Sequence, residues 1–296
     1  MSVRLAYLGL LSLTAALAAC SAPPSLESRI PGIPGDSPTS FSQSQATTYK
    51  SQLTSWLNGL SGSIGNGNVG LSMSASLIEP QYPEVARLMR AIDPGKGSVS
   101  LQKTQACSDG GSVTDTPDNP VDNDKDDIVA AYEVTVNNCK EGSSTSNGFL
   151  GVRDKNDNDP TSGFTVVTDL MVSNASGSTR LAFGFDYTPA SGGGFNVKYG
   201  ALLGSGSDKI AYGMNMTYSP KSDGDADPYN AGFLSFNGRF VYKVSTGSNP
   251  GHYVLDMKGE NLEHSDACTT SFIGGSAIFQ DNGGNSATVS YNGSPL

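Results

Sequence analysis

Alternation of apolar and polar residues over most of the chain is the feature that most limits its fold. Beyond Ser98 the 296-residue sequence consists of short alternating segments separated by turns rich in Gly, Ser, Asn and Asp. Such segments bury one face of each strand, and their short connections favour antiparallel neighbours. The expected strands are residues 128–136, 164–172, 180–187, 195–203, 209–218, 232–244, 252–257, 271–279 and 286–291.

Two helices are expected before these strands. In residues 44–60 apolar side chains recur at helical spacing, and Gly59 and Gly62 mark the expected end. Residues 83–92 form a shorter second candidate, whereas residues 71–78 alternate as a strand does. The expected fold class is mainly β: an antiparallel meander that forms an open or half barrel, with one or two N-terminal helices.

The first twenty residues are typical of a secretory signal. Arg4 precedes an apolar run over residues 5–19, and small residues lead up to Cys20. A basic start, a short apolar core and a small-residue cut site define a signal peptide, and the run is too short for a spanning helix. The motif Leu17-Ala18-Ala19-Cys20 resembles the lipobox of bacterial lipoproteins. This resemblance implies cleavage before Cys20 and its acylation through sulfur with palmitate-type chains.

The lipobox resemblance also implies a location. Two or three acyl chains on one residue give stable anchoring. By the sorting rule of this class, Ser21 after the cysteine implies the outer membrane, facing the periplasm or the cell surface. The expected domains are a signal peptide at residues 1–19, a lipidated flexible tether at residues 20–45 and a β-rich envelope domain at residues 46–296. The expected partners are the membrane and other envelope proteins.

The chain is acidic. Its formal net charge is -10, and removal of residues 1–19 removes Arg4 and no acid, which leaves -11. A charge of this sign disfavours nucleic acid and anionic lipid surfaces as partners and favours cations. No nucleic-acid partner is therefore expected.

One acidic segment is the strongest candidate for metal binding. Asp122, Asp124 and Asp126 alternate with other residues, and Glu133 stands at position twelve. This spacing resembles the calcium loop of EF-hand proteins, in which alternate carboxylates converge on an ion that needs about six to eight oxygens. The resemblance implies calcium as a cofactor, with these three aspartates as ligands and Glu133 closing the shell.

The segment departs from the EF-hand pattern in two ways. Position six is Asp127 where the pattern has Gly, and the loop runs into an expected strand where the pattern has a helix. We therefore expect a calcium loop at the head of a strand. In that setting Glu133 can point away, and Asp115 or Asp118 would supply oxygens instead.

Two further segments repeat the alternate spacing with fewer acids. The alternative interpretation of these segments is an ordinary turn without metal. Asp, Asn and Gly are common in turns because they tolerate the left-handed backbone conformation, and Asp and Asn also form local hydrogen bonds there. The weaker candidate ligands are Asp154, Asn156 and Asn158 in the second segment, and Asp223, Asp225 and Asp227 in the third.

Three cysteines remain after Cys20. An oxidising compartment favours one bridge, and Cys107 and Cys139 flank the first acidic segment, which makes them the natural pair. A closed loop of about 30 residues stabilises by roughly 3–4 kcal/mol in the chain-entropy model. Cys268 would then be a buried thiol or an intermolecular link, and the other pairings stay open.

Catalytic motifs are absent from the sequence. His252 and His264 are twelve residues apart, and no His-x-x-x-His, Gly-x-Ser-x-Gly or Cys-x-x-Cys occurs. We therefore expect no enzyme. A metal-dependent hydrolase with paired carboxylates is the second alternative, because acids are numerous.

The preferred function is that of a non-catalytic, calcium-stabilised envelope lipoprotein with a structural or assembly role. The order of elements, a helix followed by a long meander, resembles lipoprotein carriers of the LolA and LolB type. Those are half-barrels with an apolar concave face, so the resemblance implies a carrier of lipid or of a small hydrophobic ligand as the first alternative. A packed interior favours the structural role, and a large apolar pocket favours the carrier.

Overall fold

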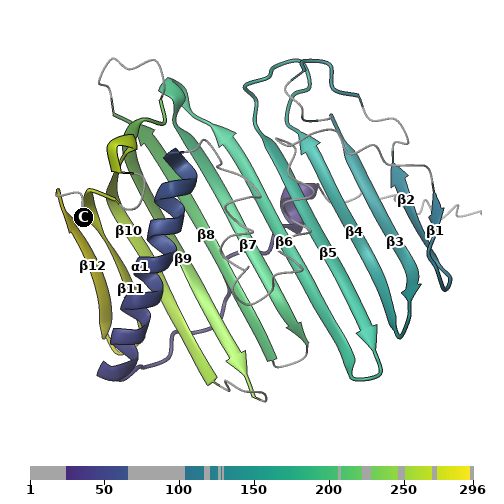
Figure 1. Cartoon of the computed structure of the whole chain (residues 1–296), viewed down its shortest axis with the longest axis horizontal. Helices are drawn as coiled ribbons and strands as arrows, with labels where there is room; N and C mark the ends of the chain where they lie inside the picture. Colours follow the sequence, from purple (N-terminus) through teal and green to yellow (C-terminus); the bar gives the residue numbers. More distant parts are fainter. Residues whose placement is uncertain are drawn as a thin grey trace, which may run out of the picture.

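A single β-sheet makes up most of the structure (Figure 1). The computed structural model describes residues 25–65, 104–116, 121–125, 128, 130–205, 208–221, 228–245, 251–268 and 272–293. Within these ranges the sheet has twelve strands, and each pairs antiparallel with its neighbours in the sequence. The sheet is not closed into a barrel. The predicted fold class, a mainly β antiparallel meander with one or two N-terminal helices, is therefore confirmed.

The strands lie across the sheet in chain order. Each predicted strand beyond residue 98 coincides with an observed one, whereas β1, β2 and β4 have no predicted counterpart. The second predicted helix, 83–92, and the predicted strand 71–78 lie outside the described residues. The strands are β1 (Gln105–Ala106), β2 (Ser112–Thr116), β3 (Tyr132–Glu141), β4 (Ser144–Asp154), β5 (Phe164–Asn174), β6 (Gly177–Pro189), β7 (Phe195–Ser205), β8 (Asp208–Pro220), β9 (Ala231–Val244), β10 (Gly251–Ser265), β11 (Gly274–Gln280) and β12 (Ser286–Asn292).

Two strands show why the sequence predicts some strands incompletely or not at all. β4 contains Gly148 and Gly151, and most of its residues are partly buried on both faces, so its sequence does not alternate clearly. β10 continues beyond its predicted end through a bulge, where its register shifts between Gly259 and Leu262. A bulge breaks the two-residue period, which makes one long strand resemble a short one followed by a loop.

The helix α1 (Gln43–Gly65) confirms the first predicted helix. Leu53 and Leu57, one turn apart on its predicted apolar face, are fully buried. The predicted end at Gly59 and Gly62 is wrong, because the helix runs through both glycines. Each helical glycine costs about 1 kcal/mol relative to Ala, and packing of an apolar face against a sheet outweighs that cost.

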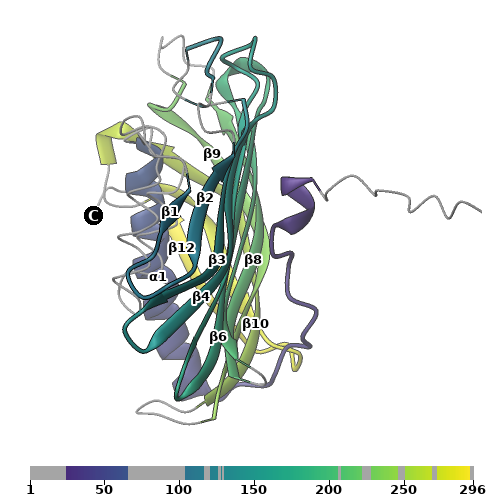
Figure 2. The same cartoon turned by 90° about the vertical axis from the view of Figure 1, so that its right-hand side faces the viewer.

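The two faces of the sheet are covered by different segments (Figure 2). α1 packs against β10, β11 and β12 on one face. The main core lies on this face and joins Leu53 and Leu57 of α1 to large side chains of the strands, among them Phe185, Met214 and Phe236. The segment that precedes α1 lies on the other face.

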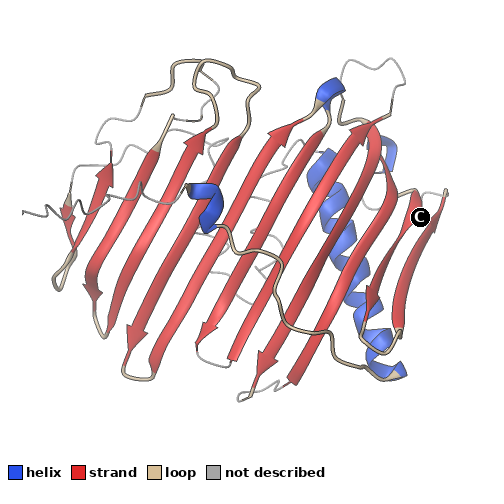
Figure 3. Cartoon of the chain, turned by 180° about the vertical axis from the view of Figure 1, so that it is seen from behind, coloured by secondary structure: helices blue, strands red, loops and turns tan. Residues whose placement is uncertain are grey.

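That preceding segment crosses the sheet from strand to strand (Figure 3). A 3-10 turn, η1 (Leu26–Arg29), lies over β4, β5 and β6, and the chain then continues across the sheet to the start of α1. We call residues 26–40 the strap. The sequence favours a flexible tether over residues 20–45, and the strap is the part of that range that lies on the sheet.

A row of glycines makes room for the strap. Gly184, Gly200 and Gly213 are paired in register on β6, β7 and β8, so they stand side by side on the strap face. Backbone atoms of strap residues 30–32 lie within 2.7 Å of the point that a Cβ on each of these glycines would occupy. Any side chain there would collide with the strap, so the row forms a shallow trough for the chain.

Charged hydrogen bonds hold the far end of the strap. The Asp36 carboxylate accepts from Lys209 Nζ at 2.8 Å and from Lys243 Nζ at 2.6 Å. Arg239 Nη1 donates to the Asp36 carbonyl at 2.7 Å, and the Thr39 N–H donates to a carbonyl of β10 at 3.0 Å. The Asp36 side chain is only 14% exposed, so these bonds are partly shielded from water.

Candidate metal centre

Every second connection of the meander lies at the same end of the sheet. The β2–β3, β4–β5 and β8–β9 connections share this end because each neighbouring pair is antiparallel. These connections carry the three Asp-rich segments singled out in the sequence. Among the predicted ligands Asp126, Asp223, Asp225 and Asp227, and the alternative ligand Asp118, lie outside the described residues. The described site is therefore built from the first two connections.

The β2–β3 connection folds back on itself. The Ala130 N–H donates to the Val121 carbonyl at 2.9 Å, and the Lys125 N–H donates to Asp122 Oδ1 at 2.7 Å. Lys125 has a positive φ of 64°. Asp side chains commonly stabilise turns in this way. This turn brings Asp122 and Asp124 beside the β4–β5 connection.

Asp157 ties the two connections together. The backbone N–H of Asn123 donates to Asp157 Oδ1 at 3.0 Å, and the Asn123 side-chain amide donates to Oδ2. Two residues further on, the hydroxyl and backbone N–H of Thr161 donate to Asp159 at 2.7 and 3.0 Å. These bonds hold the pKa of Asp159 below its usual value. The β4–β5 loop is thus fixed both internally and to its neighbour.

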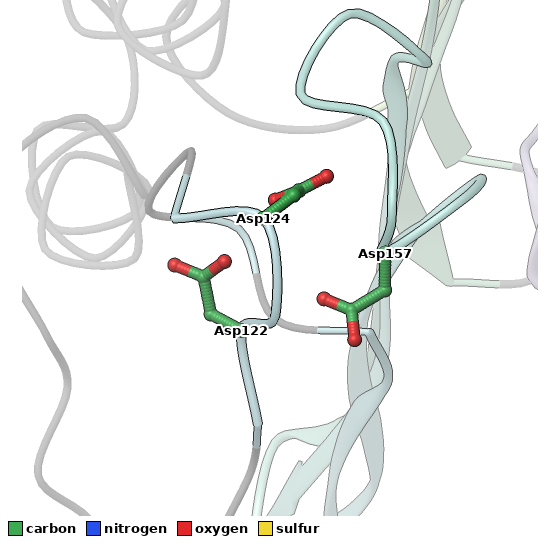
Figure 4. A group of neighbouring side chains, drawn as sticks. All are labelled: Asp122, Asp124 and Asp157. Carbon is green, nitrogen blue, oxygen red and sulfur yellow. The ribbon is translucent and has the colours of Figure 1, made fainter.

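Asp122, Asp124 and Asp157 form a group of carboxylates that could hold a metal ion (Figure 4). Each offers one oxygen, and these oxygens lie within 4.8 Å of one another. Two of the carboxylates come from one loop and the third from the loop facing it. Carboxylates this close repel each other, and a cation between them removes the repulsion. Oxygen ligands of this kind suit hard divalent cations.

Glu133, the predicted twelfth ligand, is not part of this group. It lies on β3, where its carboxylate is 3.5 Å from Nη1 of Arg29 in η1. Its register partner is Gly151, which faces Leu26 of the strap. The pleat of a strand therefore directs Glu133 to the strap face, whereas the helix of an EF-hand would turn the same position back to the ion.

The second segment contributes a residue that its spacing does not single out. Asp154 accepts from the Ser162 hydroxyl at 2.7 Å and from the Asn156 N–H at 3.2 Å, and it stabilises the turn. The Asn158 N–H donates to the Asn156 carbonyl at 2.7 Å. Among the described carboxylates Asp154 does not join the group, whereas Asp157 does. Only the side-by-side position of the two connections, which depends on strand pairing, indicates Asp157.

The predicted disulfide between Cys107 and Cys139 is present, and Cys268 is buried and not disulfide-bonded. The bridge lies in the β1–β2 turn and near the end of β3. β2 and β3 separate it from the aspartates by five registered residue pairs, roughly 15 Å at the usual strand rise. The bridge therefore encloses the acidic loop in the sequence but does not brace it directly.

The two histidines do not come together, because His252 and His264 lie near opposite ends of β10.

Comparisons with protein-family models, curated proteins and solved structures found no match to this chain. Among the described residues no helix is both long and apolar enough to cross a membrane.

Proposed function

We propose that the protein is a non-catalytic lipoprotein of the bacterial outer membrane, anchored through Cys20, with a structural or assembly role that calcium supports. The observation that carries the proposal is the meeting of Asp122, Asp124 and Asp157 from two separate connections at one end of the sheet. The lipobox motif at Leu17-Ala18-Ala19-Cys20 supports the anchor.

Calcium fits the spacing of the three carboxylates. Ca²⁺ binds oxygens at about 2.3–2.6 Å, so two oxygens on one ion lie at most about 5 Å apart. The separations within the group stay below this limit at 4.8 Å. Backbone carbonyls, water and the proposed ligand Asp126 would complete the shell. Magnesium is less suitable because it requires a tighter octahedron and gives up water reluctantly.

A bound ion would cross-link the β2–β3 and β4–β5 connections. A ligand that binds only the folded state stabilises it by RT ln(1 + [L]/Kd). With a Kd of about 10⁻⁴–10⁻³ M, as in extracellular modules, millimolar calcium contributes roughly 0.5–1.5 kcal/mol. Such a site would make the stability of an envelope protein rise with the logarithm of external calcium above the Kd.

Thermal unfolding with and without calcium tests this proposal. Calcium should raise the melting temperature, chelator should reverse the rise, and magnesium should have a smaller effect. Asp157→Asn should abolish the calcium response. Glu260→Gln, a charge-matched control on an exposed residue of β10, should keep it. An unaltered response in Asp157→Asn, or no response in the parent protein, contradicts the metal site.

Membrane fractionation tests the anchor separately. Cys20→Ser should release the protein into the soluble fraction, because the acyl chains supply the membrane affinity. Retention of the variant in membranes after a carbonate wash contradicts anchoring at Cys20. This result does not depend on calcium, so the two parts of the proposal can fail independently.

The carrier alternative has the open sheet in its favour, because an open meander can offer one face to a ligand. The apolar face, however, carries large side chains that are almost completely buried, among them Phe185, Met214 and Phe236. A face whose described large side chains are already buried supports the structural role more than the carrier role.

A further inference from the structure

A cleft of about 510 Å³ lies between the strap and the sheet, on the face opposite α1. Strap residues 28–36 form one wall, and residues of β5, β6, β7 and β8 form the floor and the other wall. The volume falls within the range of small-molecule sites, about 300–1,000 Å³. The cleft is separate from the group of aspartates, which lies in the connections at the end of the sheet.

The floor of the cleft is apolar and flat. Ala182, Leu202 and Ala211 are paired in register on three neighbouring strands, so they form one cross-strand row. Ala182 and Ala211 are almost completely buried, at 1% and 3% exposed, so the accessible apolar surface comes from Leu202 and from Ile30 and Pro31 of the strap. This arrangement offers apolar contact to a short hydrocarbon body.

Two cationic side chains stand beyond this floor. Arg180 and Lys209 belong to the next cross-strand row on the same face, with Gly204 of β7 between them. The point that a Cβ of Gly204 would occupy lies within 2.8 Å of atoms of Asp208 and Lys209, so only glycine fits between the two cations. Their Cα atoms are about two strand spacings apart, roughly 10 Å, which two long side chains can bridge to reach a common anion.

Both cations have hydrogen-bonding capacity left over. Arg180 donates Nε and Nη2 to Asp169 at 2.8 and 2.7 Å, and Lys209 donates once to Asp36. Among the described residues neither Arg180 Nη1 nor the remaining ammonium hydrogens of Lys209 have a partner. Lys243 shares the Asp36 carboxylate, so three cations face two carboxylates. The local charge is positive in a chain whose net charge is -10.

We propose that this cleft binds a small organic anion, a carboxylate or phosphate group carried on a short apolar body. The anionic group would accept from Arg180 Nη1 and Lys209 Nζ, and the body would lie between Leu202 of the sheet and Ile30 and Pro31 of the strap. A soluble metabolite and a lipid headgroup are two sources of the same chemistry. The headgroup source alone rests on the proposed anchor, because Ser28 lies eight residues from Cys20, a reach of at most about 28 Å.

Calorimetric titration with three matched probes tests the proposal. Hexyl phosphate should bind at least tenfold more tightly than inorganic phosphate, which lacks the body, and than hexanol, which lacks the charge. Arg180→Met and Lys209→Met should each lower the affinity for hexyl phosphate at least tenfold. Lys209→Met keeps the bond from Lys243 to Asp36, so the strap remains held. Lys258→Met, on an exposed lysine outside the cleft, is the control and should bind as the parent does.

Vesicle binding separates the two sources. Sedimentation of the Cys20→Ser protein with phosphatidylglycerol vesicles, but not with phosphatidylcholine vesicles, and competition by hexyl phosphate would assign the headgroup. Binding of hexyl phosphate without vesicle binding would assign a soluble anion.

The proposal is overturned if hexyl phosphate does not bind. It is also overturned if the Lys209→Met protein, shown by circular dichroism to be folded, binds hexyl phosphate as tightly as the Lys258→Met protein does. Chelation of calcium should leave hexyl phosphate binding unchanged, so failure of the calcium site does not affect this test.

Discussion

The hydroxyl oxygen of Ser61 on α1 lies 3.1 Å from Nδ1 of His264 on β10, and both side chains are completely buried. This polar contact joins α1 to the sheet. It also explains why the helix extends beyond Gly59, because its last turns have a specific partner. Burial lowers the pKa of His264, since a charged imidazole there would lose its hydration.

The first prediction concerns mild acid. Because the pKa of His264 is lower in the folded state than its usual value of about 6.5, the unfolded state takes up the proton first. Stability should therefore be highest above about pH 6.5 and fall as the pH drops below it. Melting temperatures between pH 8 and pH 5 measure this slope. His264→Gln should flatten it and exposed His252→Gln should not; equal slopes in both variants contradict the role of His264.

The second prediction concerns the charged bonds of the strap. Hydrogen bonds from Lys209 and Lys243 lower the pKa of Asp36 to about 2. The stabilisation by Asp36 is therefore complete above about pH 4 and is lost as the pH falls toward 2. Asp36→Asn should cost roughly 1–2 kcal/mol and expose the peptide bond after Arg29 to trypsin.

Limited proteolysis at neutral pH measures this exposure. Asp208→Asn is the matched control, because the Asp208 carboxylate accepts hydrogen bonds from Ser245 and, among the described residues, has no hydrogen bond to the strap. It should leave the cleavage rate after Arg29 unchanged. Equal rates in Asp36→Asn and Asp208→Asn would show that the strap is held by other contacts.

The third prediction concerns the glycine row. A Cβ at Gly200 would lie 1.6 Å from the Pro31 carbonyl oxygen, so Gly200→Ala must displace the strap. The expected cost is about 1–3 kcal/mol, as for other overpacked sites, with faster trypsin cleavage after Arg29. Gly251→Ala is the control, because the nearest atom to its Cβ would lie at 3.5 Å. If the Gly200→Ala protein is as stable and as resistant to trypsin as the control, the glycine row is not needed to hold the strap.

The sequence predicts the meander well but does not predict what lies across it. Alternation along one strand reveals that strand, and polar turns reveal the next, so β5 to β9 are recovered with small changes at their ends. The row of Gly184, Gly200 and Gly213 depends on the register of three strands, which no single segment contains. The sequence therefore predicts only a flexible tether for the strap, because the Pro, Ser and Gly content of this segment is typical of one.

The metal centre was predicted in part for a similar reason. Asp122 and Asp124 lie two residues apart in one loop, so their spacing predicts them as ligands. Asp157 reaches the group from the β4–β5 connection, the next one at the same end of the sheet, and Glu133 is directed away by the strand that carries it. Spacing within a segment cannot show a ligand that another segment supplies.

The last prediction separates the disulfide from the metal centre. The Cys107–Cys139 bridge closes a loop with a sequence separation of 32 residues, which in the chain-entropy model contributes roughly 3–4 kcal/mol. Replacement of both cysteines with Ser should therefore lower the melting temperature substantially. Because the bridge lies at the opposite end of β2 and β3 from Asp122, the variant should keep its rise in melting temperature with calcium.

Thiol labelling after denaturation provides the matching control. In the Cys20→Ser background the parent should label at one cysteine, Cys268, since the other two are paired. Loss of the calcium response together with the bridge would mean that the two ends of the β2–β3 hairpin are coupled, and the loop would then depend on the disulfide for its shape. A labelled Cys107 or Cys139 in the parent would contradict the pairing itself.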